Sequence, residues 1–473
     1  MKLGFQCLVL FLCLSLFSCS LTVKPGTGYP SQTELPDLLT KEGAAGEEWD
    51  EEEGTQMQSS PLDSLQTYQF GGRAFTVAVY DGCDFFGDGS TDGYQAALVT
   101  RNAAVEAKCG VSLVSYQNLT AESFYTDLRT AYQSGTLKCD GLLVPVRVMS
   151  LFAVNGLLVN IHSVPFLDMD AKNTHQKEMA AYTVGTVGYG YFSDIADSSP
   201  FIRCLYVNEN GVKDANVLYD AVLNGTWDYD AFYTAVKSTA FTAGLAVNGN
   251  EEELALDLFL GGGDAFMVNN PPKTPSLKDM EEIVTAFSQQ FSKLKQDAKV
   301  SYFADAFSAL KVFSRGNCAF YLGDLADGES LKNTTVPWGI LPLPHDGEAG
   351  SGYAARMGVD RMCMGVMKGT DYAFSGKIIN TLAAASYELK QGRLSSAVYS
   401  FLPSNTAAKM YRLISDSVYT DLGIDYGEIY TTLYSASRDV LVNTVVHGME
   451  YRKLYNNANN SFTRFIRDYT FYD

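Results

Sequence analysis

The sequence contains few of the residues, and none of the short motifs, from which most catalytic sites are built. Only four of its 473 residues are histidines, and they lie far apart along the chain. The patterns G-x-S-x-G, H-E-x-x-H and Walker A are all absent. The 54 acidic residues could include a carboxylate pair for glycoside hydrolysis, but no pair stands out. We therefore expect a protein that is not an enzyme and that needs no cofactor.

Spacings typical of metal sites are missing as well. The nine cysteines include no C-x₂₋₄-C pair. The loop 81–89 (DGCDFFGDG) faintly resembles a calcium loop, but it lacks the alternating ligands and the late glutamate. Most cysteines after residue 80 adjoin apolar runs, which favours buried free thiols. If a disulfide forms, Cys109 and Cys139 are the best pair, because each directly precedes a predicted strand. We expect no metal site.

The chain also has no excess of positive charge. The formal net charge is −19, and residues 41–53 (KEGAAGEEWDEEE) contribute −6 of it, with seven acids and one lysine. Nucleic-acid binding requires a clustered basic surface, so nucleic acid is excluded as a partner.

The one long apolar run lies at the N-terminus. Residues 3–17 are almost entirely apolar and follow Met1-Lys2, which suits a signal peptide, whereas a spanning helix needs roughly 20 residues. Ser18-Cys19 then reads as a lipobox, whose cysteine carries the acyl chains. We expect a signal peptide at 1–18 and a protein exported and lipid-anchored through Cys19 to the outer face of the membrane. The alternative is an ordinary cleaved signal.

Residues 19–69, acidic and poor in large apolar residues, are expected to be a disordered tether.

Alternating short elements predict an α/β lobe over residues 70–200. Strand and helix patterns joined by short loops are typical of a doubly wound sheet. Ligands of such sheets bind at the carboxyl ends of the strands, here Tyr80-Asp81 and Arg147. The strands are expected at 74–80, 111–116 and 141–146, and the helices at 93–108, 121–134 and 148–155.

The rest of the chain predicts a second lobe. More than 400 residues exceed the size at which a single core stops growing. Further strands are expected at 202–208, 318–322, 338–343 and 362–366. We assign 201–324 and about 366–473 to the second lobe with its C-terminal helices, and about 325–365 to a return into the first lobe.

Aromatic residues are abundant, with 29 tyrosines and 27 phenylalanines. Aromatic rings can stack on the C–H faces of sugars, and a concave site combining rings with polar groups suits a carbohydrate. Most of these rings are expected in the core. Those beside strand ends, Tyr80, Phe85 and Phe86, are candidates for ligand contact.

Five stretches in order resemble the bacterial extracellular solute-binding proteins of family 1, the carbohydrate-type receptors of ABC importers. They are TRNAAVEAKCGVSLVSY, CDGLLVPVRVMSLFAVNGLLVNIHSVPFLD, CLYVNENGVKDANVLYDAVLNGTWDYDAFYTAVK, GNCAFYLGDLADGESLKNTTVPWGILPLP and AKMYRLISDSVYTDLG. The resemblance implies a monomeric, two-lobed periplasmic-binding-protein-like fold with an interlobe hinge and a ligand cleft that closes on a sugar or oligosaccharide. It also implies delivery of the ligand to an ABC transporter permease.

The resemblance implies ligand contacts in the loops that border the cleft. Arg356, Asp360 and Arg361 are charged where small residues are common in the family, so an acidic sugar is an open alternative to a neutral one. A surface glycan- or peptide-binding lipoprotein without transport, and a glycoside hydrolase, also stay open. The implied contacts are Tyr80, Asp81, Phe85, Phe86, Arg147, Asp197, Ser198, Asp264, Asp324, Arg356, Asp360 and Arg361.

Overall fold

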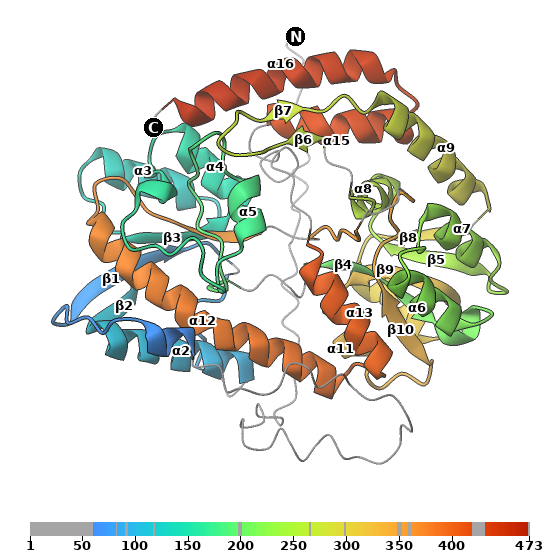
Figure 1. Ribbon diagram of the computed structural model, residues 1–473, viewed down its shortest axis with the longest axis horizontal. Helices are drawn as coiled ribbons and strands as arrows, with labels where there is room; N and C mark the ends of the chain where they lie inside the picture. Colours follow the sequence, from blue (N-terminus) through green and yellow to red (C-terminus); the bar gives the residue numbers. More distant parts are fainter. Residues whose placement is uncertain are drawn as a thin grey trace, which may run out of the picture.

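The computed structural model describes residues 60–81, 83–89, 93–116, 119–196, 201–263, 266–297, 299–347, 352–357, 361–418 and 431–471. Figure 1 shows an α/β lobe at each side, with helices spanning the space above and below. No helix among these residues is both long and apolar enough to cross a membrane. The signal peptide, Cys19 and most of the expected tether lie outside the described residues.

The first lobe contains a four-stranded sheet in the order β11-β3-β1-β2. Its first three strands along the chain are parallel, and β11 joins antiparallel at the edge. All five residues of β3 are buried, as expected for a central strand covered on both faces. The predicted doubly wound lobe is thus confirmed. The elements are β1 (Arg73–Val79), α2 (Gly93–Cys109), β2 (Val111–Ser115), α3 (Phe124–Gln133), β3 (Gly141–Pro145), α4 (Val146–Val154), α5 (Gln176–Ala181) and β11 (Met362–Gly365).

The second lobe contains a five-stranded sheet in the order β10-β4-β9-β5-β8. Strands β9, β5 and β8 are parallel, whereas β4 and β10 run antiparallel to their neighbours. Sequence patterns missed β5 and β8. The elements are β4 (Arg203–Asn208), α6 (Ala215–Leu223), α7 (Tyr229–Lys237), β5 (Ala243–Asn248), α8 (Glu251–Gly261), α9 (Glu281–Asp297), β8 (Val300–Phe303), α10 (Ala306–Ser314), β9 (Cys318–Asp324), α11 (Asp327–Leu331) and β10 (Trp338–Leu341).

Two segments belong to the lobe opposite to the one we expected. Strand β10 pairs with β4, so residues 338–341 are part of the second lobe. Helix α12 (Tyr372–Ser400) packs on α2 of the first lobe, and only α13 (Asn405–Asp416) returns to β10. Local patterns define an element but do not define its partner, which explains the error.

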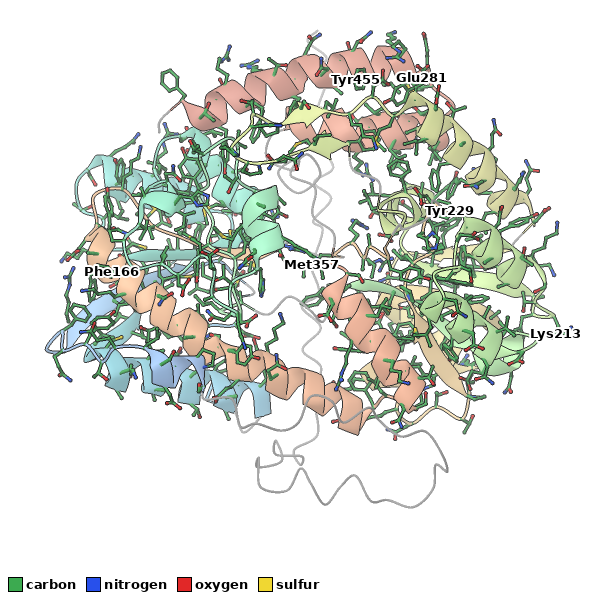
Figure 2. All side chains as sticks on the ribbon, in the orientation of Figure 1. Phe166, Lys213, Tyr229, Glu281, Met357 and Tyr455 are labelled. Carbon is green, nitrogen blue, oxygen red and sulfur yellow. The ribbon has the colours of Figure 1, made fainter. Side chains whose placement is uncertain are left out.

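The lobes are joined by crossing segments that pair with one another. Ile202 and Met357 form an antiparallel bridge, and the Arg203 amide donates to the Arg356 carbonyl over 2.8 Å. Ala355 bridges Val418 on its other side. Figure 2 shows Met357 between the two lobes, at this crossing. The paired segments form the interlobe hinge that was expected.

The C-terminal helices connect the lobes on a further side. Helix α15 (Thr431–Val445) packs on α8 and α9, and α16 (Tyr451–Thr470) runs back to α4. Figure 1 shows α16 lying across the top of both lobes. Between the lobes on that side runs the short hairpin of β6 (Met267–Val268) and β7 (Ser276–Leu277). Asn269, in this hairpin, donates from Nδ2 to the Thr183 carbonyl of the first lobe over 2.8 Å.

The folded body begins about ten residues earlier than the expected end of the tether. Helix α1 (Pro61–Ser64) packs on α12. The Tyr68 amide then donates to the Lys108 carbonyl over 3.0 Å, and the Phe70 ring lies 4.9 Å from that of Phe374. Residues 60–69 are therefore part of the first lobe.

The six described cysteines are all free, so the suggested disulfide between Cys109 and Cys139 is wrong. Cys109 instead donates to the Thr381 hydroxyl over 3.5 Å, and Cys139 to the Gly141 carbonyl over 3.1 Å. Burial raises the pKa of Cys139 to about 12, which keeps it a thiol at neutral pH. The alternative expectation, buried free thiols, holds for five of the six, and Cys83 is partly exposed.

Candidate functional site

The carboxyl ends of β1 and β3 bring Tyr80 and Arg147 together. Tyr80 extends β1 by donating its amide to the Leu143 carbonyl over 2.9 Å. Arg147 opens α4 directly after β3, and its guanidinium carbon lies 5.8 Å from the centre of the Tyr80 ring. Both side chains are half-buried, and Asp81 next to them is exposed. This edge of the first lobe therefore presents an aromatic ring, a cation and a carboxylate.

A buried arginine that the sequence analysis missed holds the loop after β1. Arg101, on α2, donates to the Phe85 carbonyl over 2.7 Å and to the Ile195 carbonyl over 3.0 Å. Burial lowers the pKa of Arg101 to about 10. Phe85 is only 1% exposed, so its ring belongs to the core and offers no surface to a ligand in this conformation. Phe86 is half-buried against Phe85.

Arg361 belongs to a group of ion pairs, here named the first-lobe cluster. Its Nη1 lies 2.7 Å from Glu178, at the start of α5. His175 and Lys390 lie 2.7 Å and 3.3 Å from Asp194. Burial acts to raise the pKa of Glu178, but Arg361 and His175 more than compensate and lower it.

One atom of the first-lobe cluster is left without a partner. Arg361 is 7% exposed, and its Nη2 is buried without a hydrogen bond to any described residue. A buried donor of this kind normally has a partner. Among the sequence-predicted residues that the structure describes, Arg361 is the one with such an unsatisfied side-chain donor.

Arg356 and Asp324 belong to a second group of ion pairs, here named the second-lobe cluster, which surrounds Asp257 on α8. Arg203 donates to Asp257 over 2.9 Å, and Arg356 donates to its other oxygen over 2.6 Å. Arg203 also lies 3.3 Å from Asp324, and Arg356 lies 2.7 Å from Glu253. Because Arg203 and Arg356 lie on the two crossing segments, the cluster ties both segments to the second lobe.

The charge state of Asp257 follows from its two arginine partners. Asp257 is fully buried, which acts to raise its pKa, but Arg203 and Arg356 together lower it. The carboxylate is therefore ionised at neutral pH. A buried charge of this kind is stable only while its partners are present.

The pKa of Asp324 is shifted in the opposite direction to that of Asp257. Burial raises the pKa of Asp324 to about 6, despite the attraction of Arg203, and the nearby Asp327 carboxylate adds to the rise. Because the folded-state pKa lies above the unfolded value, Asp324 favours folding at low pH, and that contribution disappears as the pH rises through about 6.

We expect Asp324→Asn to be more stable at pH 7 than the unaltered chain, on the order of 2 kcal/mol, and the difference to disappear near pH 4. Urea unfolding of both proteins between pH 4 and pH 7 measures this. A difference that is constant with pH would contradict the raised pKa.

The remaining candidate residues are not placed. Asp197, Ser198, Asp264 and Asp360 lie outside the described residues, so their roles stay predictions. Among the described residues no group of three or more histidines, cysteines or acids is arranged to hold a metal ion.

Solved structures with the same architecture include several solute-binding proteins. A cyclo/maltodextrin-binding protein complexed with maltotetraose aligns with a TM-score of 0.55 at 13% identity, over 84% of this chain and 98% of its own. The sugar-binding protein MalE from Xanthomonas citri gives 0.53 at 14%, over 83% and 97%. A family 1 extracellular solute-binding protein from Bifidobacterium longum subsp. infantis gives 0.51 at 11%, over 83% and 100%. This chain has the solute-binding-protein fold. Its sequence matches no protein-family model and no curated protein.

Within the solute-binding-protein fold, each ion cluster borders the crossing segments. Arg361 directly follows the segment that contains Arg356 and Met357, and its carbonyl accepts from the Val146 amide over 2.7 Å. Arg203 directly follows Ile202, which bridges Met357. The two clusters therefore flank the hinge, one on each lobe.

Sequence patterns offered one signal for the second-lobe cluster. Arg203 interrupts the apolar run IRCLYVN, and all six residues of β4 are buried. An arginine in a buried strand requires a carboxylate partner. Which carboxylate supplies it depends on strand order and helix packing, and Asp257 lies 54 residues away.

Proposed function

We propose that this chain is an extracellular carbohydrate-binding receptor of an ABC importer, which holds its ligand between the lobes and delivers it to a membrane permease. The observation that carries the proposal is the two-lobed solute-binding-protein fold with a paired hinge, flanked on each side by a cluster of ion pairs. The structural relatives named above, sugar-binding proteins among them, support the choice of ligand class.

The charge balance of the first-lobe cluster favours a neutral, hydroxyl-rich ligand. The cluster holds two permanent cations, Arg361 and Lys390, and two carboxylates, Glu178 and Asp194. The Arg361–Glu178 pair offers donors and acceptors to hydroxyl groups, whereas the exposed Lys390 only balances the charge of Asp194, so the cluster requires no net charge from the ligand. The neighbouring Tyr80 ring can pack against the C–H face of a sugar. An acidic sugar would add a negative charge that this balanced cluster does not need.

Binding should be visible as both stabilisation and closure. A thermal-shift screen with glucose, galactose, maltose, maltotetraose and glucuronate should give one saturable rise in melting temperature, because a ligand of the folded state stabilises it by mass action. Small-angle X-ray scattering with that saccharide should show a smaller radius of gyration, because contact with both lobes favours the closed state. Shortened products after incubation with maltotetraose, or no shift with any saccharide, would contradict the proposal.

The proposal includes a lipid anchor at Cys19. The apolar run that ends at Ser18-Cys19 supports it. Cells fed radiolabelled palmitate should label the unaltered protein, whereas Cys19→Ala should lose the label and leave the membrane fraction. Its affinity for the saccharide should not change, since the anchor and the binding lobes are separate. Retained label in Cys19→Ala would contradict the anchor.

A further inference from the structure

A pocket of about 380 Å³ is lined by residues of the first lobe, none of which belongs to either ion cluster. Its walls come from three parts of the chain: α1, the loop 168–173 and the middle of α12. The volume falls within the range of small-molecule sites. None of the sequence-predicted site residues lines it. The lining residues are Pro61, Ser64, Leu65, Asp168, Ala171, Lys172, Asn173, Asn380, Ala384 and Tyr387.

Asn173, in the wall of the pocket, is buried, and its side-chain amide lacks a hydrogen bond among the described residues. The residue is 3% exposed, and its Nδ2 has no hydrogen-bond partner in the described part of the chain. Leaving a buried amide donor unpaired is unfavourable. The Asn173 carbonyl accepts from the Asp194 amide over 3.2 Å, which holds the residue in place. The side-chain amide of Asn173 is thus a donor without an acceptor among the described residues.

Two further lining residues keep polar groups available. Asn380 accepts from the Asp168 amide at its Oδ1 over 3.1 Å, which leaves its own NH₂ group without a partner among the described residues. The Tyr387 hydroxyl likewise makes no hydrogen bond, and its ring makes no contact with another ring, within the part of the chain that the structure describes. The pocket therefore combines two amide donors with an unstacked aromatic side chain.

The charged residues of the pocket decide between ligand classes. Asp168 and Lys172 contribute one charge of each sign to the lining. A carboxylate or phosphate would be attracted by Lys172 and repelled by Asp168, so this balanced lining does not favour an anion. A neutral polyol can donate hydroxyl protons to Asp168 and accept from Asn173 and Asn380. Its C–H groups can contact the apolar lining, which includes Leu65 and Ala384.

From these contacts we infer that the pocket is a second saccharide site, separate from the site between the lobes, and that it takes a neutral mono- or disaccharide. Helix α1 forms one wall, so the ligand lies between the segment that follows the tether and helix α12. Asn173 and Asn380 in the lining supply amide groups, and Tyr387 supplies the ring. The inference does not rest on the proposed transport function, because none of its residues belongs to either ion cluster.

Isothermal titration and saturation-transfer NMR on the full chain in detergent test the site, with glucose, galactose, maltose and lactose as probes and glucuronate as the anionic comparison. Tyr387→Ala and Asn173→Leu should each weaken one neutral-saccharide binding event at least roughly tenfold, the effect of about 1.4 kcal/mol. Tyr302→Ala, an exposed tyrosine on β8 of the second lobe, is the matched control and should change nothing. Glucuronate should compete poorly.

Arg361→Met separates this site from the one between the lobes. It should weaken the interlobe binding event by roughly 10–100-fold and leave the event that depends on Tyr387 unchanged. If Asn173→Leu fails to fold, Tyr387→Ala alone carries the test, because that residue is only half-buried. The inference is overturned if no saccharide binds, or if every saccharide response is lost in Arg361→Met and unchanged in Tyr387→Ala. The pocket would then be a hydrated surface feature.

Discussion

Replacing Asp257 with asparagine is expected to lower the free energy of unfolding by about 3–5 kcal/mol, because the buried Arg203 and the half-buried Arg356 would lose their shared carboxylate. Arg203 and Arg356 are held by its two oxygens at 2.9 Å and 2.6 Å, and Asp257 itself is fully buried. Asparagine is similar in size but keeps only one acceptor oxygen. Urea unfolding at pH 7, followed by circular dichroism, measures the loss.

A surface pair provides the comparison for this prediction. Asp297 pairs with Lys237 over 2.9 Å, but both side chains are exposed. Asp297→Asn should therefore leave stability nearly unchanged, since water replaces the lost partner. The interpretation of Asp257 as the centre of a buried cluster fails if the two variants unfold at the same urea concentration. Because Arg203 and Arg356 flank the hinge pairing, Asp257→Asn should also increase hydrogen exchange at their amides.

Replacing Arg361 with methionine is expected to weaken saccharide binding between the lobes by roughly 10–100-fold. A hydrogen bond to a charged group contributes about 1.5–3 kcal/mol, and each 1.4 kcal/mol changes affinity tenfold. Its Nη2 is buried without a partner among the described residues, so a hydrogen bond to a ligand would satisfy this donor. Isothermal titration with the saccharide that gives the largest thermal shift measures the change.

Lys390→Met is the matched control for Arg361→Met. Lys390 belongs to the same cluster, but its side chain is 42% exposed and pairs with Asp194 over 3.3 Å. We expect its affinity to change less than threefold, because water can replace an exposed ion pair. Unfolding curves of both variants separate loss of binding from loss of folding. Equal affinities for Arg361→Met and the unaltered chain would show that Nη2 does not contact the ligand.

Much of the fold could be predicted because local patterns are strong in the first lobe. The run GLLVP is apolar throughout and forms the fully buried β3, and GYQAALVTRNAAVEAK forms most of α2. Strand β5 was missed because its run AGLAVN is made largely of small residues, and β8 was missed because it has only four residues, VSYF. Their place in the sheet comes from pairing with β9 and with each other, which local composition does not encode.

The candidate site could be predicted only in part. Tyr80 and Arg147 follow buried parallel strands, so their meeting at one sheet edge follows from the strand order. Phe85 follows the same strand, yet its carbonyl is held by Arg101 and its ring enters the core. Glu178 and Asp257 were not singled out, because nothing in their neighbourhoods distinguishes them from the other acids of the chain.

The sequence by itself determined the N-terminal export signal as a hypothesis, the α/β character of both lobes, the carboxyl strand ends of the first lobe and the arginine inside β4. These depend on residues close together in the chain. Only the tertiary structure decided which lobe α12 and β10 join, that the six described cysteines stay free, and which carboxylates neutralise Arg203, Arg356 and Arg361. Ion pairing and sheet order depend on distances in space between residues that are up to 183 positions apart in these pairs, from Glu178 to Arg361. Local patterns do not predict such distances, because many different packings are compatible with the same periodicity of apolar residues.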